Sequence, residues 1–273
     1  MKLEEIYYPI NKELNLVGQE LKHFNKKIKT DLLKEILNNF FKVPGKQLRP
    51  TLALLSAGII NNQLTESKNY QLIQLSVFLE LMHSASLIHD DIIDGDFIRR
   101  GQKTLNKIYG RKIAVLAGDV IYAQAFSIVS NSLPKEFANI IVDLTENMCA
   151  AEIEQANNCV LSKDKYYKII EGKTAFFMAI SCKLGAVIAG GDNDKINSLE
   201  NYGYNLGMAY QILDDFMDDD LDTALNITLE DAQNFANKAI ASIETFENNQ
   251  YKQSLINLVN HIVNTSYKKV SIS

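Results

Sequence analysis

The sequence predicts an all-α fold, a single-domain bundle of about ten helices around a central cavity. Apolar residues recur at three- and four-residue spacings along nearly the whole chain, and strand-like alternation is scarce. Four prolines and thirteen glycines are few helix breakers for 273 residues, and no proline follows Pro134. With 47% hydrophobic residues the chain can bury a core, which excludes a disordered protein.

Turn-forming residues divide the predicted helices in chain order. Breaks fall at Val-Pro-Gly 43–45, at Gly95, at Pro134 and at Gly190 to Asn193. Neither a low-complexity linker nor a repeat divides the sequence, so residues 1–273 are predicted to form one domain. The expected helices cover 3–22, 30–42, 48–61, 67–94, 105–132, 135–158, 164–190, 194–220, 228–247 and 251–268.

Composition and charge exclude several classes of protein. A formal net charge of −5 argues against a general nucleic-acid binder. The odd number of cysteines and the absence of a Cys-x-x-Cys pair predict reduced thiols and a cytoplasmic location. The N-terminal stretch carries acids where a secretory signal needs an apolar core. Charged residues such as Glu80, Asp119 and Lys183 interrupt the apolar runs, so we expect no integral membrane segment.

The first candidate site is the run His89-Asp90-Asp91-Ile92-Ile93-Asp94. Asp90 and Asp94 are i, i+4 partners on one helix face, and Asp91 lies one step round. Carboxylates at a helix C-terminus oppose the helix dipole, so a cation is expected to compensate them. Oxygen ligands without His or Cys favour Mg²⁺. For one such motif alone, a solvated acidic helix end is an equally good interpretation.

A second run, Asp214-Asp215-Phe216-Met217-Asp218, repeats the pattern at the end of another apolar helix. Two acidic helix ends suggest two walls facing across a cleft, with Mg²⁺ holding a diphosphate between them. Asp219, Asp220 and Asp222 extend this run and are expected to be solvated.

Basic residues complete the predicted diphosphate site. Arg99 and Arg100 follow the first acidic run, and Lys46 and Arg49 open a predicted helix. Free N–H groups at a helix start attract anions, and arginine can grip phosphate in a bidentate fork. Each basic pair taken singly is more often a surface charge, but the combination with two acidic runs indicates a site.

The motifs GK-x-x-RP at 45–50, HSASLIHDDIIDGDFIRRGQKT at 83–104, GKTAFFMAISCKLGA at 172–186 and GMAYQILDDFMD at 207–218 together resemble the all-trans polyprenyl diphosphate synthases. The resemblance covers about residues 40 to 220. It implies the isoprenoid synthase type of all-α fold and a transferase that is Mg²⁺-dependent. The implied reaction condenses isopentenyl diphosphate with an allylic diphosphate, farnesyl or geranyl, in isoprenoid biosynthesis.

The resemblance also implies roles for individual residues. Asp90, Asp94 and Asp214 would be the principal Mg²⁺ ligands, supported by Asp91, Asp215 and Asp218. The assigned metal ligands are Asp90, Asp94, Asp214 and Asp218. The assigned catalytic residues are Asp90, Asp91, Asp94, Lys173, Asp214 and Asp215. Isopentenyl diphosphate would be held by Lys46, Arg49, His83 and Arg100, and the allylic diphosphate by Arg99, Lys173, Thr174 and Gln211.

Product length is predicted from the helix before the first acidic run. Ala85 and Ser86 are small, and the resemblance implies that an aromatic residue at the position of Ala85 blocks further elongation and restricts the enzyme to short-chain products. These two small side chains leave a channel open for the growing chain, so we expect a product longer than C20. Met82, on a lower turn of the same helix, would close the far end of this channel.

The sequence departs from the family pattern after Asp218, where a lysine-bearing lid segment is expected. Here the chain runs through 219–224 directly into a C-terminal helical region, which indicates a deletion or an omitted segment. Three single residues also differ from the family pattern: Gln47 stands where a basic residue is usual, Lys103 where proline is usual and Ala151 where glycine is usual. Two alternatives stay open: a non-catalytic or regulatory subunit of a heteromeric synthase, and, with less support, a terpene cyclase. The family resemblance implies a homodimer, and a heteromer is also possible.

Overall fold

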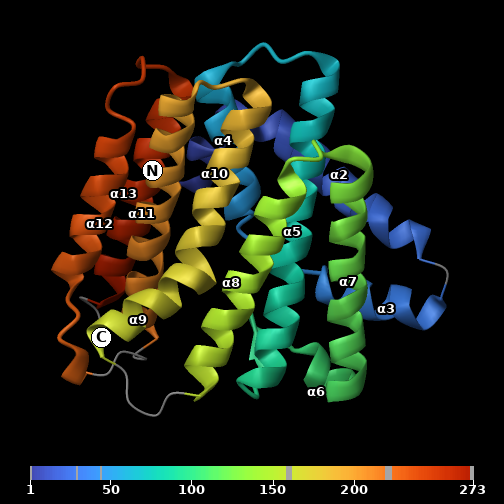
Figure 1. The fold of residues 1–273 in the computed structure, drawn as a ribbon. Coiled ribbons are helices and arrows are strands. Elements are labelled where there is room, and N and C mark those ends of the chain that lie inside the picture. Colours follow the sequence, from blue (N-terminus) through green and yellow to red (C-terminus); the bar gives the residue numbers. More distant parts are fainter. Residues whose placement is uncertain (1, 29, 44, 158–161, 219–222, 271–273) are drawn as a thin grey trace. The chain divides into compact units, whose positions relative to one another are not determined.

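The computed structural model describes residues 2–28, 30–43, 45–157, 162–218 and 223–270 (Figure 1). Within these ranges the regular secondary structure is helical apart from one short hairpin, which confirms the all-α class. The α-helices are α1 Leu3–Ile6, α2 Asn11–Lys27, α3 Asp31–Phe40, α4 Leu48–Ile60, α5 Glu66–Ile93, α6 Leu105–Tyr109, α7 Arg111–Ser132, α8 Phe137–Asn157, α9 Lys163–Ile170, α10 Phe176–Ala189, α11 Asn193–Met217, α12 Leu229–Ser242 and α13 Gln250–Val270. The remaining elements are the short helical turns η1 Tyr8–Ile10, η2 Glu171–Ala175 and η3 Thr223–Leu225 and the strands β1 Ile98–Arg99 and β2 Gln102–Lys103.

The chain divides into two compact units. The first unit contains Met1–Asn11, Leu52–Leu72 and Glu136–Ser273, and the second contains Lys12–Thr51 and Ile73–Lys135. Helix α5 runs without a break from the first unit into the second. Each unit carries one of the two acidic runs.

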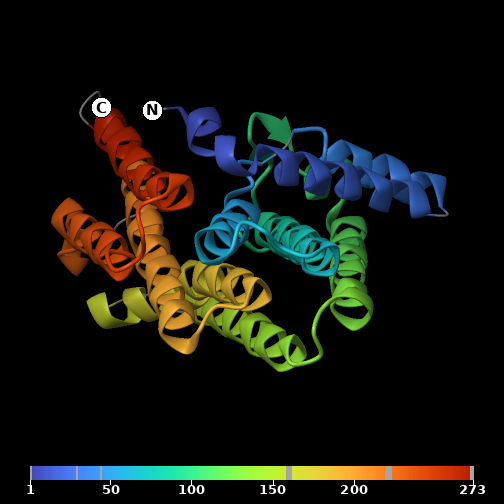
Figure 2. The same ribbon diagram turned by 90° about the horizontal axis from the view of Figure 1, so that it is seen from above.

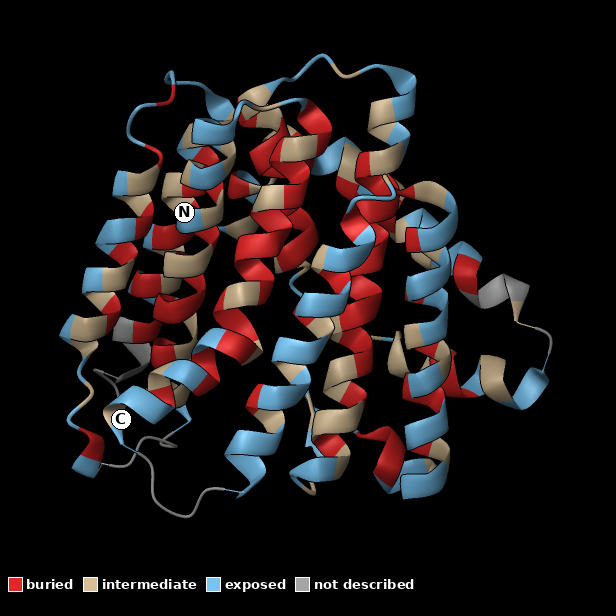
Figure 3. Cartoon of the chain, viewed as in Figure 1, coloured by how far each residue is buried: buried red, intermediate tan, exposed pale blue. Residues whose placement is uncertain are grey.

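The first unit is built around α10 and α11, which lie side by side in Figures 1 and 2. Glycines on α11 let the two backbones approach closely. A Cβ at Gly203 would lie 2.5 Å from the Met178 carbonyl oxygen, and one at Gly207 would lie 2.5 Å from Ala175 Cα. Helix α10 is buried along most of its length (Figure 3). This contact fixes the helix that ends in the second acidic run against the segment that carries Lys173 and Thr174.

The second unit positions the first acidic run on α5. Side chains on successive turns of this helix, including Phe78, Met82 and Ala85, are fully buried. Near its end His89 packs on α7 at Gly118, where a Cβ would fall 2.3 Å from His89 Nε2. The same nitrogen lies 3.2 Å from the Val115 carbonyl oxygen, which can only accept a hydrogen bond.

The observed helices differ from the expected ones mainly at four places. The expected helix 228–247 ends five residues early, at Ser242, and the helix expected to end at residue 22 continues to Lys27. The expected helix 3–22 is divided by η1, where Pro9 begins a new turn. The expected helix 105–132 is divided at Gly110, whose φ of +83° ends α6. The expected helix 164–190 is continuous but contains a π-helical turn, η2, between α9 and α10.

By length and composition alone, three helical segments of the described chain could cross a membrane, which the sequence analysis did not expect. The percentages that follow refer to the most apolar 18-residue stretch of each segment. In Glu66–Ile93 78% of that stretch is buried within the protein, and in Lys163–Ala189 72% is buried. In Arg111–Ser132 only 28% is buried, so α7 presents apolar side chains to the exterior (Figure 3).

Candidate active site

The first acidic run lies in the last turn of α5. Asp91 is buried, Asp90 is half-buried and Asp94 is exposed. The Asp94 N–H donates to the Asp90 carbonyl oxygen at 2.8 Å, so the helical i, i+4 relationship extends to Asp94. Asp90 and Asp94 therefore share one face, as the spacing predicts, and Asp91 faces the protein.

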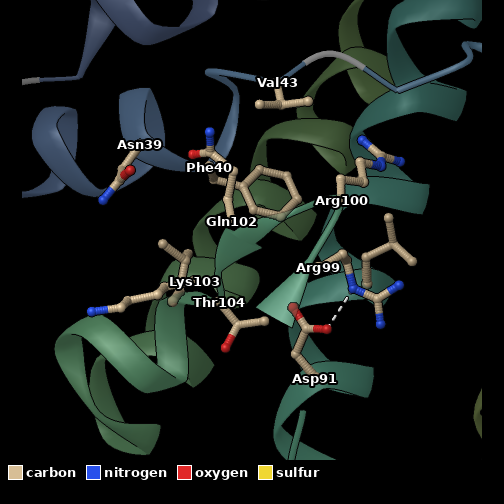
Figure 4. Close-up of a pocket in the computed structure, with 11 residues that line it drawn as sticks. Asn39, Phe40, Val43, Asp91, Arg99, Arg100, Gln102, Lys103 and Thr104 are labelled. Atoms are coloured by element: carbon tan, nitrogen blue, oxygen red, sulfur yellow. Dashed lines mark hydrogen bonds and ion pairs between the residues drawn. The ribbon is translucent and has the colours of Figure 1, made fainter. Parts of the chain in front are cut away.

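Asp91 is held by a protein side chain. Arg99 on β1 donates from Nε to Asp91 Oδ1 at 2.5 Å (Figure 4). Burial raises the pKa of Asp91, and the hydrogen bond and positive charge of Arg99 partly offset this effect. The family resemblance implies that Arg99 binds the allylic diphosphate. In the structure its Nε is committed to the second aspartate of the first run.

The loop after α5 is anchored by a residue that the sequence analysis missed. Asn106 is buried, and its Nδ2 donates to the carbonyl oxygens of Asp91 at 2.9 Å and Asp96 at 3.0 Å. Thr104 Oγ1 donates to the same Asp96 oxygen at 2.9 Å. These bonds satisfy carbonyl groups that a helix end leaves without intrahelical partners. They fix the path from Asp91 to the β1–β2 hairpin.

The hairpin turn brings the Arg100 side chain against Gly45, the first residue of the GK-x-x-RP motif. Arg100 has a φ of +51°, and its guanidinium lies so close to Gly45 that a Cβ there would be 2.9 Å from Nη2. Lys46 is exposed and precedes α4, whereas Arg49 is only 8% exposed. The second unit therefore contains all four residues predicted to hold isopentenyl diphosphate, His83 included.

Two titratable groups on α5 lie in the field of these arginines. Burial lowers the pKa of His83 well below its ordinary value, and the charges of Arg49, Arg100 and Arg99 lower it further. Glu80 is 7% exposed; burial raises its pKa, and the charges of Arg49 and Arg100 partly offset that shift. Glu80 is thus a buried acidic group in the field of Arg49 and Arg100, and no role was predicted for it from the sequence.

A small hollow lies between α3, the end of α5 and the hairpin. Phe40, Val43, Asp91 and Arg100 are among the residues around it (Figure 4). Its volume of about 40 Å³ holds a water molecule and no prenyl chain.

The three predicted chain-length residues lie on α5 one to two turns before Asp90. Ala85 and Met82 are fully buried, and Ser86 is half-buried. Ser86 Oγ donates to the His83 carbonyl oxygen at 2.9 Å. The small side chain of Ala85 therefore faces the interior of the second unit.

The second acidic run ends α11 in the first unit. Asp214 and Asp215 are half-buried, and Asp218 is exposed at the C-cap. The Asp218 N–H donates to the Asp214 carbonyl oxygen at 3.0 Å, which again extends the i, i+4 relationship to the last aspartate. Asp219, Asp220 and Asp222 lie outside the described residues, as does most of the expected deletion at 219–224.

Asp215 is the counterpart of Asp91, because protein side chains hold it. Tyr166 on α9 donates its hydroxyl to Asp215 Oδ2 at 2.6 Å, and Gln211 Nε2 donates to Oδ1 at 2.8 Å. Thr174 Oγ1 donates to Gln211 Oε1 at 2.7 Å. Burial and the neighbouring Asp215 raise the pKa of Tyr166, so its phenol stays a proton donor.

Lys173 lies in η2, the π-helical turn. Its ammonium is 2.9 Å from Glu152 Oε2 and 3.1 Å from Gln155 Oε1, both on α8. A π-helical turn shifts the register of the residues that follow it, and such turns are frequent at functional sites. The structure brings together Thr174, Gln211 and Asp215, while Lys173 is paired with α8.

The donor chemistry of both runs fits a hard divalent cation, because the predicted ligands are all carboxylates. Among the described residues, no group of three or more His, Cys, Asp or Glu side chains converges as a metal site. Mg²⁺ is commonly bound through one or two carboxylates together with waters and substrate phosphates, so carboxylate pairs suffice.

Sequence reasoning missed Tyr166, Glu80, Asn106 and Glu152. Tyr166 gives no spacing signal in the sequence, because its partner Asp215 lies 49 residues further along the chain. Glu80 was visible as the acid that interrupts an apolar run. Asn106 and Glu152 are recognised only through contacts with distant residues.

These features define a class: an all-α protein with two aspartate-rich helix ends, the first of them followed by basic side chains suited to anions. The chain belongs to the polyprenyl synthetase family, which matches residues 30–264. A short chain isoprenyl diphosphate synthase of Methanothermobacter thermautotrophicus is 35% identical over 181 residues, 64% of this chain and 54% of that protein. An octaprenyl diphosphate synthase of Haemophilus influenzae is 34% identical over 177 residues, 64% of this chain and 52% of that one.

Component 2 of a heptaprenyl diphosphate synthase of Bacillus subtilis is 31% identical over 223 residues, 80% of this chain and 62% of that protein. The chain thus spans about half to two thirds of the length of these relatives. A geranylgeranyl pyrophosphate synthetase from Pyrococcus horikoshii shares the fold with a TM-score of 0.85 and 23% identity over 96% of this chain and 99% of that one. A Caulobacter crescentus polyprenyl synthase complexed with calcium and isoprenyl diphosphate matches with a TM-score of 0.85 and 22% identity over 96% and 97%.

Proposed function

We propose that this chain is a Mg²⁺-dependent trans-prenyltransferase that condenses isopentenyl diphosphate with an allylic diphosphate. One observation carries the proposal: the two acidic helix ends have the same internal organisation. In each, a protein side chain holds the second aspartate, Asp91 through Arg99 and Asp215 through Tyr166. The aspartates at the first and fifth positions of each Asp-Asp-x-x-Asp run then share a helix face as a carboxylate pair. Membership of the polyprenyl synthetase family supports this reading.

The metal ligands we propose are Asp90, Asp94 and Asp214, with Asp218 in support. Carboxylate donors suit Mg²⁺, and a relative's structure holds calcium with an isoprenyl diphosphate. When bound, Mg²⁺ neutralises the negative charge that develops on the departing diphosphate. The proposal requires both acidic runs to act on one diphosphate.

The basic cluster of the second unit is the proposed site for isopentenyl diphosphate. Arg49 and Arg100 supply planar guanidinium groups, and Lys46 supplies a point charge. His83 is neutral near pH 7, because its pKa is lowered well below the ordinary value. A neutral imidazole still donates one hydrogen bond and adds no positive charge to a cluster that is already basic.

The allylic diphosphate is proposed to contact Arg99, Lys173, Thr174 and Gln211. Lys173 can exchange its pairing with Glu152 for the phosphate oxygens. The allylic C–O bond then breaks, and its electron pair leaves with the diphosphate. The double bond of isopentenyl diphosphate attacks the allylic cation, and a proton is lost to the departing diphosphate. The product is one isoprene unit longer.

We propose a product longer than C20, with farnesyl or geranyl diphosphate as primer. Ala85 presents only a methyl group to the interior, and Met82 and Phe78 on earlier turns are buried and larger. The relatives include short-chain and octaprenyl synthases, so product length rests on these side chains.

A homodimer in the cytoplasm is the assembly that we propose. Apolar side chains on α7 are exposed, among them Val115 at 40%, Leu116 at 60% and Phe126 at 38%. Such a face is costly in water, and a second copy of the chain can cover it. Light scattering should give twice the chain mass for the wild type and a monomer for Leu116→Glu. A monomeric wild type contradicts the proposal.

A non-catalytic subunit is the second candidate. It is favoured by the expected deletion after Asp218 and by similarity to a protein named as one component of a synthase. The discriminating experiment incubates the purified chain with Mg²⁺, farnesyl diphosphate and labelled isopentenyl diphosphate. Labelled polyprenyl diphosphate from the chain alone supports the enzyme, whereas product only with an added partner protein supports the subunit.

A further inference from the structure

Tyr166 is a buried residue, 6% exposed, that neither the motifs nor the proposed mechanism uses. It lies on α9, outside the GKTA motif and outside both acidic runs. Its hydroxyl donates to Asp215 Oδ2 at 2.6 Å, one of the shorter side-chain hydrogen bonds of the described chain. A bond from a hydroxyl to a carboxylate is charge-assisted and stronger than one between neutral groups.

The other oxygen of Asp215 is also engaged. Gln211 donates to Oδ1 at 2.8 Å, and Thr174 donates to Gln211 at 2.7 Å. Three hydrogen bonds, from Thr174 to Gln211, from Gln211 to Asp215 and from Tyr166 to Asp215, form a network that we call the relay. The relay joins η2, α11 and α9 within the first unit. Because both carboxylate oxygens have donors, the rotamer of Asp215 is fixed from two sides.

This fixation bears on the neighbouring ligands. Asp214 and Asp218 lie at the end of α11, where a helix frays unless side chains hold its last turn. A tether at Asp215 holds that turn against α9 and η2. Residues one position apart on a helix point about 100° apart, so the tether sets the direction of Asp214 without occupying its face.

We propose that Tyr166 is a positioning residue that holds the last turn of α11 through Asp215 and thereby orients Asp214 for the Mg²⁺–diphosphate complex. This inference rests on the proposed function. Tyr166 itself touches neither substrate nor metal. Its contribution is the tether, in the way that hydrogen bonds behind a metal ligand orient the ligand.

The test compares Tyr166→Phe with Tyr167→Phe, which loses the hydroxyl of the next residue on the same helix. The ring of Tyr167 packs on Phe235, and Tyr167 is not part of the relay. Calorimetry would measure binding of inorganic diphosphate in the presence of Mg²⁺, and thermal unfolding would show that both variants fold. We expect Tyr166→Phe to weaken binding about 10-fold and Tyr167→Phe to leave it unchanged. The KM for isopentenyl diphosphate should stay at the wild-type value in both.

A double-mutant cycle with Asp215→Asn isolates the tether. If Tyr166 acts through Asp215, Tyr166→Phe should weaken binding much less in the Asp215→Asn background than in the wild type. Additive losses, or wild-type binding by Tyr166→Phe, would overturn the positioning role and leave the proposed function intact. A wild-type chain that binds no diphosphate with Mg²⁺ would overturn both, so the two failures are distinguishable.

Discussion

The guanidinium of Arg100 fills the space where a side chain at residue 45 would begin. A Cβ on Gly45 would lie 2.9 Å from Nη2 and 3.0 Å from Nη1 of Arg100. The glycine of the GK-x-x-RP motif is thus required by an arginine that follows the first acidic run, within the same compact unit.

Gly45→Ala should therefore displace Arg100 and weaken the site for isopentenyl diphosphate. Because the displaced group is the end of a flexible side chain, the fold should tolerate the change. We expect the KM for isopentenyl diphosphate to rise about 10-fold, as for the loss of one charge-assisted hydrogen bond. The KM for the allylic diphosphate should not change. Steady-state kinetics with each substrate varied in turn measures both.

Gly18→Ala is the matched control for that substitution. No atom lies within 4 Å of a Cβ at Gly18, which is inside α2 in the same unit. Alanine there should stabilise the helix by up to about 1 kcal/mol and leave both KM values unchanged. An unaltered KM in Gly45→Ala would contradict the contribution of Arg100.

Two lysines of the first unit make nearly identical ion pairs, and only one is expected to bind substrate. Lys173 lies 2.9 Å from Glu152 and Lys183 lies 2.9 Å from Glu200. We expect Lys173→Ala to raise the KM for the allylic diphosphate about 10- to 100-fold. Lys183→Ala should lower stability slightly and leave that KM unchanged. Equal kinetic effects of the two variants would remove Lys173 from the proposed site.

His83 should make folding stability depend on pH. Its pKa in the folded protein lies well below the ordinary value of 6.5, so below about pH 6.5 the unfolded chain binds a proton that the folded chain does not. Its contribution to stability is therefore present above pH 6.5 and lost as the pH falls, by at most about 1.4 kcal/mol per pH unit.

His83→Gln should flatten this loss in urea unfolding between pH 7 and pH 5. His23→Gln, a change at an exposed position of α2, should keep the wild-type slope. A His83→Gln protein with the wild-type slope would show that the imidazole titrates normally in the folded state.

Ala85→Phe should shorten the product. A phenyl ring at this fully buried position fills the space beside the growing chain, at a stability cost of about 1–3 kcal/mol for overpacking. Chromatography of the labelled product, together with thermal unfolding of the variant, measures both effects. If a folded Ala85→Phe enzyme makes the wild-type product, the channel does not pass Ala85.

The helices were predictable because apolar periodicity and breakers act locally. Residues 67–94 were expected as one helix, and α5 spans Glu66–Ile93. The π-helical turn at Glu171–Ala175 was not predicted, because an extra residue in one turn leaves the apolar pattern almost unchanged. The hairpin was missed because two residues per strand give no alternation to recognise.

The sequence predicted which residues form the site better than it predicted which of their side chains bond to one another. Spacing identified Asp90 and Asp94 as one pair and Asp214 and Asp218 as another. Spacing alone does not show that Arg99 binds Asp91 or that Tyr166 binds Asp215, since those contacts depend on how a loop and a neighbouring helix pack.

The most direct test of the central claim is a crystal structure with Mg²⁺ and an unreactive allylic diphosphate analogue. We predict one diphosphate whose metal ions are ligated by Asp90 and Asp94 from α5 and by Asp214 from α11. A diphosphate whose metal ions contact only one of the two helices, or no bound diphosphate at millimolar ligand, would contradict the account.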